Sequence, residues 1–376
     1  MNTQQLHGTT RALVSLEAFR HNIGCVRSYC GRTTRIMAVV KANAYGHGMI
    51  EISRQAIREG VDALAVARVR EALEIRESGI LHPLLVFEVP PDRLIDAALA
   101  AGIELSVSTV EGARAISRAA STGKWNAAVH VKVDTGMGRL GFADTAAPEE
   151  IASALRLPHL ELAGVYSHFA TSEDPDTAFA VSQLARFNEL IENLRRIGIE
   201  VPLRHMANSG AVISMPDAHL DMVRPGIMLY GYTPSPSMSG RFPLVPVMSL
   251  VSNISMLRTV GKGTSISYGR RYITQRSTTI ATVPAGYADG YSRLLTNRAS
   301  ALIRGNIYPV VGTICMDHLM IDVGPDPRCQ TGDTVTLIGS DGARSITAWD
   351  IAQTLGTIPY EVTSLITDRI PRVFIG

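Results

Sequence analysis

Short apolar segments alternate with amphipathic segments through the part of the chain that ends near Tyr230. A short apolar run of this kind is typical of a strand buried on both faces, as in a parallel sheet. Eight such segments, most of them followed by a helical pattern, predict a (β/α)8 barrel of the TIM type, and a doubly wound sheet is the alternative that counting does not exclude. The predicted strands are 35–41, 63–68, 84–88, 105–108, 129–134, 162–169, 205–209 and 222–230.

The segments between these strands carry helical patterns. The longest, 177–197, has apolar residues at helical spacing along its whole length. The first, 16–29, follows a short predicted strand at 11–14, and Ser15 is suited to cap it. The other predicted helices are 48–60, 69–79, 93–101, 110–121 and 149–155.

The residue pattern changes at the proline- and serine-rich segment 234–240, which is typical of a linker. Beyond it the pattern is dominated by strands, and only 346–355 looks helical. Consecutive strands without crossover helices predict an antiparallel, all-β domain. We therefore expect a barrel domain at 1–240 and a β domain at 241–376, with the strand at 11–14 belonging to either one. The predicted strands of the β domain are 248–260, 278–284, 301–307, 310–315, 319–323 and 334–338.

The composition suits a soluble protein with a sizeable core. Of the 376 residues, 46% are hydrophobic and 19% charged, and the net charge is only +2, which does not favour a nucleic acid or an anionic membrane as a partner. No apolar run approaches the roughly 20 residues that span a bilayer. The start of the chain lacks the pattern of a signal peptide, and the four cysteines are too scattered for a disulfide framework. We expect a cytoplasmic protein.

Lys41 stands where the apolar run 35–40 ends, followed closely by Tyr45 and two glycines. It would therefore lie at the carboxyl end of a strand, the edge at which barrel enzymes carry their chemistry. A lysine flanked by apolar residues can be kept partly neutral, and a neutral amine can attack a carbonyl to form a Schiff base. The alternative is an ordinary lysine with its ammonium in water.

Lys132 and Arg139 flank a glycine-rich loop at the end of the fifth predicted strand. Its glycines match the dinucleotide-binding pattern G-x-G-x-x-G, but residues 142–148 separate them from the next helix, so the pattern lacks the helix N-terminus that binds a pyrophosphate. Two cations close together are costly unless an anion lies between them. We therefore interpret this loop as an anion site, with two solvated cations beside a tight turn as the alternative.

The ends of the later strands add further polar groups. His168 ends the sixth strand, where a buried structural histidine is the alternative, and no histidine spacing predicts a metal site. Ser209, Gly226 and Ile227 belong to the segments that end the seventh and eighth strands, where barrel enzymes build phosphate sites, although Ser209 is equally suited to cap a helix. Tyr45 could add a phenolic donor.

The β domain carries tyrosines and a methionine in glycine-containing segments. Tyr268, Tyr287, Met316 and its neighbour Asp317, and Tyr360 are the residues concerned. Taken alone, these segments are typical of hairpin turns in which tyrosines cap an apolar face.

The segment AVVKANAYGHG, residues 38–48, closely resembles the pyridoxal-phosphate lysine segment of alanine racemases. Seven or more local motifs match that family in the right order, from about residue 11 to 372. The resemblance implies that Lys41 carries pyridoxal 5'-phosphate. It also implies that His168 stacks on the cofactor ring or bonds to the arginine behind it, and that Arg224 faces the pyridine nitrogen. Tyr45, Ser209, Gly226, Ile227 and Tyr360 would complete the cofactor site.

The same resemblance assigns the substrate side of the site. Arg139 would hold the substrate carboxylate and orient a catalytic tyrosine, and Lys132 would be carbamylated so that its anion offsets Arg139. Tyr268 would be the second catalytic base. Tyr287 would line the entry corridor, and Met316, with Asp317 supporting it, would give a backbone amide to the carboxylate.

The resemblance thus implies a two-base alanine racemase. Tyr268 would take the Cα proton from L-alanine and Lys41 from D-alanine, in a homodimer in which Tyr268 and Met316 reach the partner subunit's site. The enzyme would supply D-alanine for peptidoglycan or catabolise it. Arg224 favours moving one proton over breaking a carbon–carbon bond, which speaks against the related decarboxylases. A racemase of serine or of broader range, and a pyridoxal-phosphate-binding protein without catalysis, are the remaining alternatives.

Overall fold

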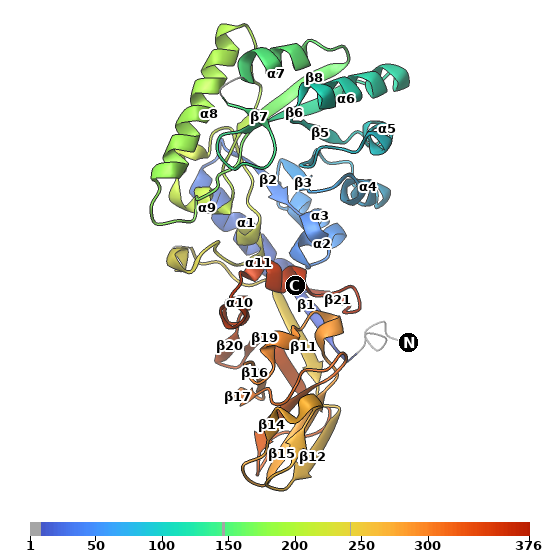
Figure 1. Ribbon diagram of the computed structural model, residues 1–376, viewed down its shortest axis with the longest axis vertical. Helices are drawn as coiled ribbons and strands as arrows, with labels where there is room; N and C mark the ends of the chain where they lie inside the picture. The colour runs from blue at the N-terminus through green and yellow to red at the C-terminus, as the bar shows by residue number, and fades with distance from the viewer. Residues whose placement is uncertain (1–8, 145–146, 241) are drawn as a thin grey trace. The chain divides into compact units, whose positions relative to one another are not determined.

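The computed structural model describes residues 9–144, 147–240 and 242–376, and the chain divides into two compact units (Figure 1). The first, which we call the barrel unit, comprises Phe19–Ala44 and Met49–Val245. The second, which we call the β unit, comprises the described residues up to Ala18, together with Tyr45–Gly48 and Pro246–Gly376.

The barrel unit is built on eight parallel strands that close into a ring. They are β2 (Arg35–Val39), β3 (Ala63–Val66), β4 (Leu84–Val86), β5 (Glu104–Val107), β6 (Ala127–Asp134), β8 (Leu160–Tyr166), β9 (Arg204–His205) and β10 (Met222–Val223). Neighbours follow the order β5-β4-β3-β2-β10-β9-β8-β6, and pairing of β5 with β6 closes the ring. All pairings are parallel, so the C-terminal strand ends meet at one edge. The (β/α)8 prediction is confirmed, and the doubly wound alternative is wrong.

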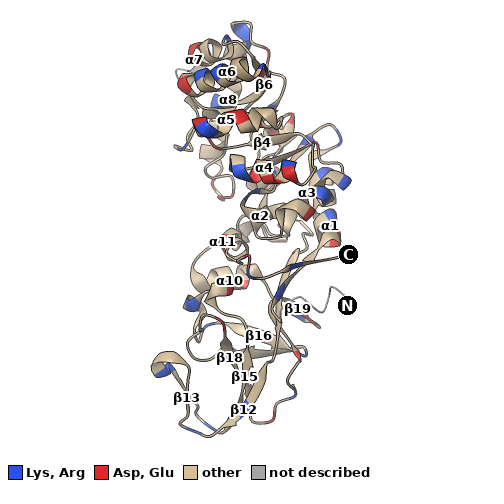
Figure 2. Ribbon diagram, turned by 90° about the vertical axis from the view of Figure 1, so that its right-hand side faces the viewer, with Lys and Arg blue, Asp and Glu red and all other residues tan. Residues whose placement is uncertain are grey.

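Helices surround these strands (Figure 1). In α6, Ala113, Ile116 and Ala120 are buried, and the Thr109 hydroxyl caps the helix by accepting from the Gly112 N–H at 3.0 Å. Arg occurs together with Asp or Glu on α4, α5 and α6, whereas the charged residues of α7 are Glu alone (Figure 2). No helix in the described ranges is both long and apolar enough to cross a membrane. The helices up to Val245 are α1 (Leu16–Cys30), α2 (Lys41–Tyr45), α3 (Met49–Arg58), α4 (Val69–Glu77), α5 (Asp92–Ala100), α6 (Val110–Gly123), α7 (Ala147–Leu155), α8 (Ala178–Arg196) and α9 (Ser209–Ser214).

Part of the barrel interior is apolar. Met37, Ala63, Ala65, Leu85 and Met222, from four neighbouring strands, pack as one buried cluster. Burying a side chain as large as that of Met37 or Leu85 contributes about 1.5–3 kcal/mol. This cluster stabilises the ring on which the polar side chains of the other strands are mounted.

The last two barrel strands are much shorter than predicted. The expected strand 205–209 ends at His205, and Ser209 instead begins α9, because the Asn208 side chain caps that helix by accepting from the Ala211 N–H at 3.0 Å. The expected strand 222–230 ends at Val223, and its apolar end forms the 3-10 helix η3 (Ile227–Tyr230). A buried apolar run does not distinguish a strand from a helical turn.

The described residues of the β unit form three sheets. The largest has the order β17-β16-β19-β11-β1-β21, with β20 paired to β19, and a three-stranded sheet has the order β12-β15-β18. The predicted strand 248–260 is broken into β11 and β12, and 310–315 forms only an isolated bridge at Val310. The strands are β1 (Arg11–Ser15), β11 (Met248–Asn253), β12 (Met256–Val260), β13 (Ser265–Ile266), β14 (Tyr272–Ile273), β15 (Thr278–Val283), β16 (Ser300–Ile303), β17 (Asn306–Pro309), β18 (Leu319–Gly324), β19 (Thr334–Asp341), β20 (Arg344–Ile346) and β21 (Arg372–Ile375).

Short helical elements connect these strands and carry most of the residues singled out in the β domain. They are the 3-10 helices η5 (Tyr268–Arg270), η6 (Tyr287–Asp289) and η7 (Arg293–Leu295) and the α-helices α10 (Ala348–Leu355) and α11 (Pro359–Ser364). β1 pairs antiparallel with β11 and parallel with β21, within the β unit.

Candidate active site

Lys41 begins a left-handed turn directly after the first barrel strand. Ala42, Asn43, Ala44 and Tyr45 all have φ of 53°, a conformation that costs residues other than glycine about 1–2 kcal/mol each. Hydrogen bonds hold the turn: the Ala44 N–H donates to the Val40 carbonyl at 2.9 Å, and the Asn43 side chain accepts from the Met49 N–H at 2.8 Å. Strain of this kind persists only where its surroundings over-determine it, which is typical of functional sites.

A carboxylate supports the same turn from the neighbouring helix. Glu71 on α4 accepts from the Ala42 N–H at 2.6 Å with one oxygen, and from the N–H groups of Ala67 and Arg68 with the other, both at 2.9 Å. Burial lowers the pKa of Lys41, the positive charge of Arg139 lowers it further, and Glu71 partly offsets both. The Lys41 amine is thus more easily neutral than an ordinary lysine, as a nucleophile or base requires.

Arg224 is buried at the C-terminal end of β10. Its Nη2 donates to the carbonyls of Ser167 at 2.7 Å and Met206 at 3.1 Å, and its Nη1 donates to Nδ1 of His205 at 3.0 Å. Burial lowers the pKa of Arg224 to about 10, so the guanidinium stays charged at neutral pH. His168 follows β8, and its Nδ1 lies 3.4 Å from Nη2 of Arg224.

His168 is surrounded by positive charge. Burial lowers the pKa of His168 well below its usual value, and Arg224, Arg139, Lys132 and Lys41 each lower it further. The imidazole is therefore neutral, and two arginines and two lysines act on it at one edge of the barrel. Such a cluster is costly unless an anion binds within it, and a phosphate or a carboxylate supplies the needed charge.

Lys132 is the most deeply buried of the lysines around His168, with 5% of its surface exposed. Its Nζ donates to the Val133 carbonyl at 2.6 Å and lies 5.5 Å from the centre of the Tyr166 ring. Burial and the charge of Arg224 lower the pKa of Lys132 to about 7, against the opposing effect of Asp134. A large part of this amine is therefore neutral at physiological pH.

The glycine-rich loop after β6 wraps around Asp134. Although burial opposes it, hydrogen bonds from the N–H groups of residues 136–138 lower the pKa of Asp134, which keeps the carboxylate charged. Gly141 has φ of 127°, and a Cβ there would lie 2.6 Å from the Asp134 nitrogen, so this position requires glycine. The loop leaves Arg139 exposed and continues into β7 (Phe142–Ala143), with no helix opening from its glycines.

The residues predicted to bind phosphate in the barrel unit lie together. The buried Ser209 hydroxyl accepts from the Gly226 N–H at 2.9 Å and from the Met228 N–H at 3.4 Å, which places Ile227 in the same turn. In the β unit, the rings of Tyr45 and Tyr360 lie with their centres 5.9 Å apart, and burial raises the pKa of Tyr45. The structure thus groups these five residues into two local clusters, one in each unit.

Three of the predicted residues of the β unit are exposed and lie on segments that hydrogen bonds join. Tyr268 on η5 has 72% of its surface exposed, Met316 52% and Tyr287 40%. The Thr313 hydroxyl donates to the Tyr268 carbonyl at 2.7 Å, and the Tyr287 N–H donates to the Cys315 carbonyl at 3.1 Å. These bonds tie the turns that carry Tyr268 and Tyr287 to the segment that carries Met316.

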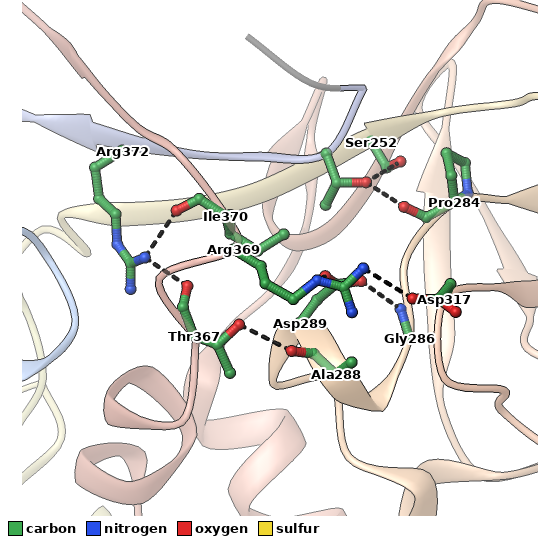
Figure 3. Close-up of polar contacts among 11 residues, drawn as sticks. Ser252, Pro284, Gly286, Ala288, Asp289, Asp317, Thr367, Arg369, Ile370 and Arg372 are labelled. Carbon is green, nitrogen blue, oxygen red and sulfur yellow. Dashed lines mark hydrogen bonds and ion pairs between the residues drawn. The ribbon is translucent and has the colours of Figure 1, made fainter.

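Arg369 joins the segments that carry Asp289 and Asp317 (Figure 3). It pairs with Asp317 at 2.8 Å and Asp289 at 3.6 Å, and Asp289 in turn accepts from the Gly286 N–H at 2.9 Å. Gly286 is required because a Cβ there would lie 2.2 Å from the Met316 carbonyl oxygen. Sequence reasoning found Asp317 but missed Arg369 and Asp289.

Comparison with known proteins identifies the arrangement. A family model of the alanine racemase N-terminal domain matches residues 14–234, and a model of the alanine racemase C-terminal domain matches residues 247–374. The chain belongs to the alanine racemase family. It is 42% identical over 367 residues to alanine racemase 2 of Caldanaerobacter subterraneus subsp. tengcongensis, covering 97% of this chain and 95% of that protein.

Solved structures agree with this assignment. The alanine racemase of Clostridium difficile 630 superposes with a TM-score of 0.95 at 37% identity, covering 98% of this chain and 96% of that one. A histidine racemase from Leuconostoc mesenteroides subsp. sake has a TM-score of 0.90 at 28% identity, covering 99% of each chain. Family membership therefore extends over both units.

The barrel-unit residues fit the pyridoxal phosphate on which alanine racemases depend. The cofactor carries an aldehyde, for which Lys41 offers an amine of lowered pKa, and a phosphate, for which the Ser209 hydroxyl and the turn at Gly226 and Ile227 offer a polar site. Glu71 contacts the turn after Lys41 and His205 contacts Arg224, and sequence reasoning missed both residues. Glu71 had a detectable signal, since it stands at the third position of a helix as in a capping box.

Proposed function

We propose that the chain is an alanine racemase that interconverts L-alanine and D-alanine with bound pyridoxal phosphate, supplying D-alanine for peptidoglycan or catabolising it. The proposal is carried by the buried Arg224 at the end of β10, whose guanidinium lies 3.4 Å from Nδ1 of His168, and β10 pairs with the strand that leads to Lys41 and its amine of lowered pKa. When bound, pyridoxal phosphate supplies the electron sink that makes the Cα proton of an amino acid removable. The side chains must then hold this group, orient the substrate and move one proton.

Lys41 would bind the cofactor covalently through its amine, which Glu71 and the left-handed turn hold at the barrel edge. The Ser209–Gly226 contact supports a phosphate site at the ends of β9 and β10. The residues that we assign to the cofactor are Lys41, Tyr45, His168, Ser209, Arg224, Gly226, Ile227 and Tyr360.

Arg224 is assigned to the pyridine nitrogen. With a pKa of about 10, its guanidinium is charged at neutral pH and would keep that nitrogen unprotonated. The ring is then a weaker electron sink than one opposed by a carboxylate. This arrangement favours removal and return of one Cα proton over cleavage of a carbon–carbon bond.

Two bases on opposite faces of the substrate would move that proton. We assign Tyr268 to the proton of L-alanine and the Lys41 amine to that of D-alanine, and each well-placed base contributes about 10²–10⁴-fold. A free phenol has a pKa of about 10, so Tyr268 needs positive charge nearby to act as a base. Arg139, relayed through the neutral His168, is our candidate for that charge.

The substrate carboxylate would be held by Arg139 and the backbone amide of Met316, with Tyr287 lining the approach and Asp317 holding the Met316 segment through Arg369. Lys132 is assigned as a carbamate that offsets Arg139. The partly neutral amine of Lys132 supports this, because only a neutral amine adds carbon dioxide.

We propose a homodimer with shared active sites, in which the β domain, 241–376, gives Tyr268 and Met316 to the barrel, 1–240, of the partner. The exposure of Tyr268 and Met316 in the single chain supports this, since catalytic side chains are rarely left in open solvent. The four cysteines are free thiols, which supports a cytoplasmic location.

The test is solvent deuterium incorporation at Cα of L- and D-alanine, with L-serine and L-histidine as competing substrates. We expect exchange and racemisation of alanine well above the other two. Lys41→Ala should lose the visible absorption of the bound cofactor and the activity together, whereas Lys262→Ala, at an exposed position, should keep both. Racemisation retained by Lys41→Ala, or a wild type that exchanges no alanine proton, would contradict the proposal.

A further inference from the structure

A continuous chain of polar side chains crosses the interior of the barrel. Glu104 binds Nε2 of His130 at 2.8 Å, Nδ1 of His130 binds Nε2 of His205 at 2.9 Å, and Nδ1 of His205 binds Nη1 of Arg224 at 3.0 Å. Glu104 is the first residue of β5 and Arg224 follows the last residue of β10. Because all strands are parallel, the chain runs from the N-terminal face of the barrel to the active-site edge.

The hydrogen bonds run in one direction. A guanidinium only donates, so Nδ1 of His205 accepts, and a neutral His205 must carry its proton on Nε2. Nε2 of His205 then donates to Nδ1 of His130, and Nε2 of His130 donates to Glu104, which as a carboxylate only accepts. Burial lowers the pKa of His205 well below its usual value, and Arg224 lowers it further, so this ring is neutral. One tautomer of each histidine satisfies every contact.

The backbone is adapted to admit His130. The register between β6 and β8 shifts between Val129 and His130, and bulges of this kind re-aim a side chain near functional sites. Gly164 lies between His130 and the neighbouring strand, and a Cβ at Gly164 would lie 2.8 Å from the Leu203 carbonyl oxygen and 2.9 Å from Nδ1 of His130. Barrel interiors are usually filled by branched apolar residues, so a glycine and a bulge around a polar chain are a departure that stability alone does not call for.

A second ring fixes the plane of His205. Tyr166 stacks on His205 with ring centres 5.0 Å apart and planes 12° apart, and its hydroxyl is bonded to the Ser106 hydroxyl at 2.7 Å. His205 therefore has little rotational freedom. What remains to be set in this ring is the position of its proton.

We propose that Glu104 and His130 are positioning residues that hold His205 in the tautomer that accepts from Arg224, and thereby hold Nη1 of Arg224 in place. This inference rests on the proposed function, in which Arg224 faces the pyridine nitrogen. Because the Glu104 carboxylate can only accept, it fixes the direction in which each hydrogen bond between Arg224 and Glu104 is donated. If both rings carried the proton on Nδ1, the N–H of His205 would point at the N–H of Arg224, and the contact would be repulsive.

Glu104→Gln tests this assignment, because an amide has the shape of the carboxylate but can either accept from or donate to His130. The matched control is Glu161→Gln, which removes the same charge at the start of β8, where Glu161 accepts only from the exposed Asn126 among the bonds described. The holoenzyme, labelled with ring-15N histidine, is studied by solid-state 15N NMR. kcat and KM for alanine and the visible absorption of the bound cofactor are measured on the same variants.

In the wild type, we expect His130 and His205 to carry their protons on Nε2 alone. In Glu104→Gln, a second population with protons on Nδ1 should appear and kcat should fall about 3- to 30-fold. KM and the cofactor absorption should stay the same, because in the proposed site Glu104 contacts neither the substrate nor the cofactor. Glu161→Gln should match the wild type in every measurement.

Three results would overturn the inference. They are an Nδ1 proton or a doubly protonated ring in the wild type, unchanged tautomers in Glu104→Gln whether or not kcat falls, and altered tautomers with unchanged kcat. Even if Glu104→Gln does not fold, the wild-type spectrum still tests the inference, because it shows which nitrogen of His130 and of His205 carries the proton. A wild type that binds the cofactor at Lys41 without racemising alanine contradicts the proposed function, whereas normal wild-type activity with an unaffected Glu104→Gln contradicts only the positioning role.

Discussion

The buried amine of Lys132 makes the free energy of unfolding depend on pH. Its pKa is about 7 in the folded chain and is close to the ordinary value of 10.5 when the chain unfolds. Between these values the unfolded state binds more protons, so stability rises with pH in this window and is lowest below pH 7. The slope from one such group is at most about 1.4 kcal/mol per pH unit.

Lys132→Met should therefore remove a pH dependence of stability. In bicarbonate-free buffer, urea unfolding of the wild type should gain free energy between about pH 7 and 10 relative to Lys132→Met, while below pH 7 the variant should be the more stable protein. Lys124→Met, at an exposed position, serves as the control. Equal pH slopes for the wild type and Lys132→Met would show that the buried amine has an ordinary pKa.

At the scale of elements, the left-handed turn after Lys41 lowers the stability of the folded chain through backbone strain, and it holds Lys41 in place. Ala42 is exposed and has φ of 53°, so its Cβ adds strain without packing. Ala42→Gly should relieve that strain and stabilise the folded chain by about 1 kcal/mol. It should also loosen the Lys41 backbone and lower kcat several-fold, because a glycine turn samples more conformations.

Lys124 offers a matched control for this prediction, since it is exposed, has φ of 56° and ends α6 away from the site. Lys124→Gly should stabilise by a similar amount and leave kcat unchanged. The measurements are urea unfolding and steady-state kinetics with L-alanine. If Ala42→Gly gains stability at full kcat, the strain in this turn has no role in catalysis.

Features of this site that depend on one element could be predicted from the sequence, whereas features that depend on contacts between elements could not. Lys41 was placed at a strand end because apolar periodicity and its break are local signals, and β2 indeed ends just before it. The left-handed turn was not predicted, because no glycine stands at residues 42–45 and the turn depends on Glu71 from another element. The links of His130 to Glu104 and His205 join residues 26 and 75 positions apart, and such pairings have no local pattern.

At the scale of the whole molecule, the two proposed bases belong to different units of one chain. Lys41 lies in the barrel unit and Tyr268 in the β unit, where it is largely exposed. If each active site takes its Lys41 from one subunit and its Tyr268 from the other, a chain that lacks one base can complement a chain that lacks the other. Activity is then a property of the symmetric dimer and not of the single chain.

Mixing Lys41→Ala with Tyr268→Ala tests this arrangement. Each variant alone should be inactive, but after the subunits are exchanged, roughly half of the dimers should be mixed, and each mixed dimer holds one site with both bases and one with neither. The mixture should recover about a quarter of the wild-type activity. A mixture that never exceeds its parents, while tagged subunits demonstrate that exchange took place, would place both bases in the same subunit's site.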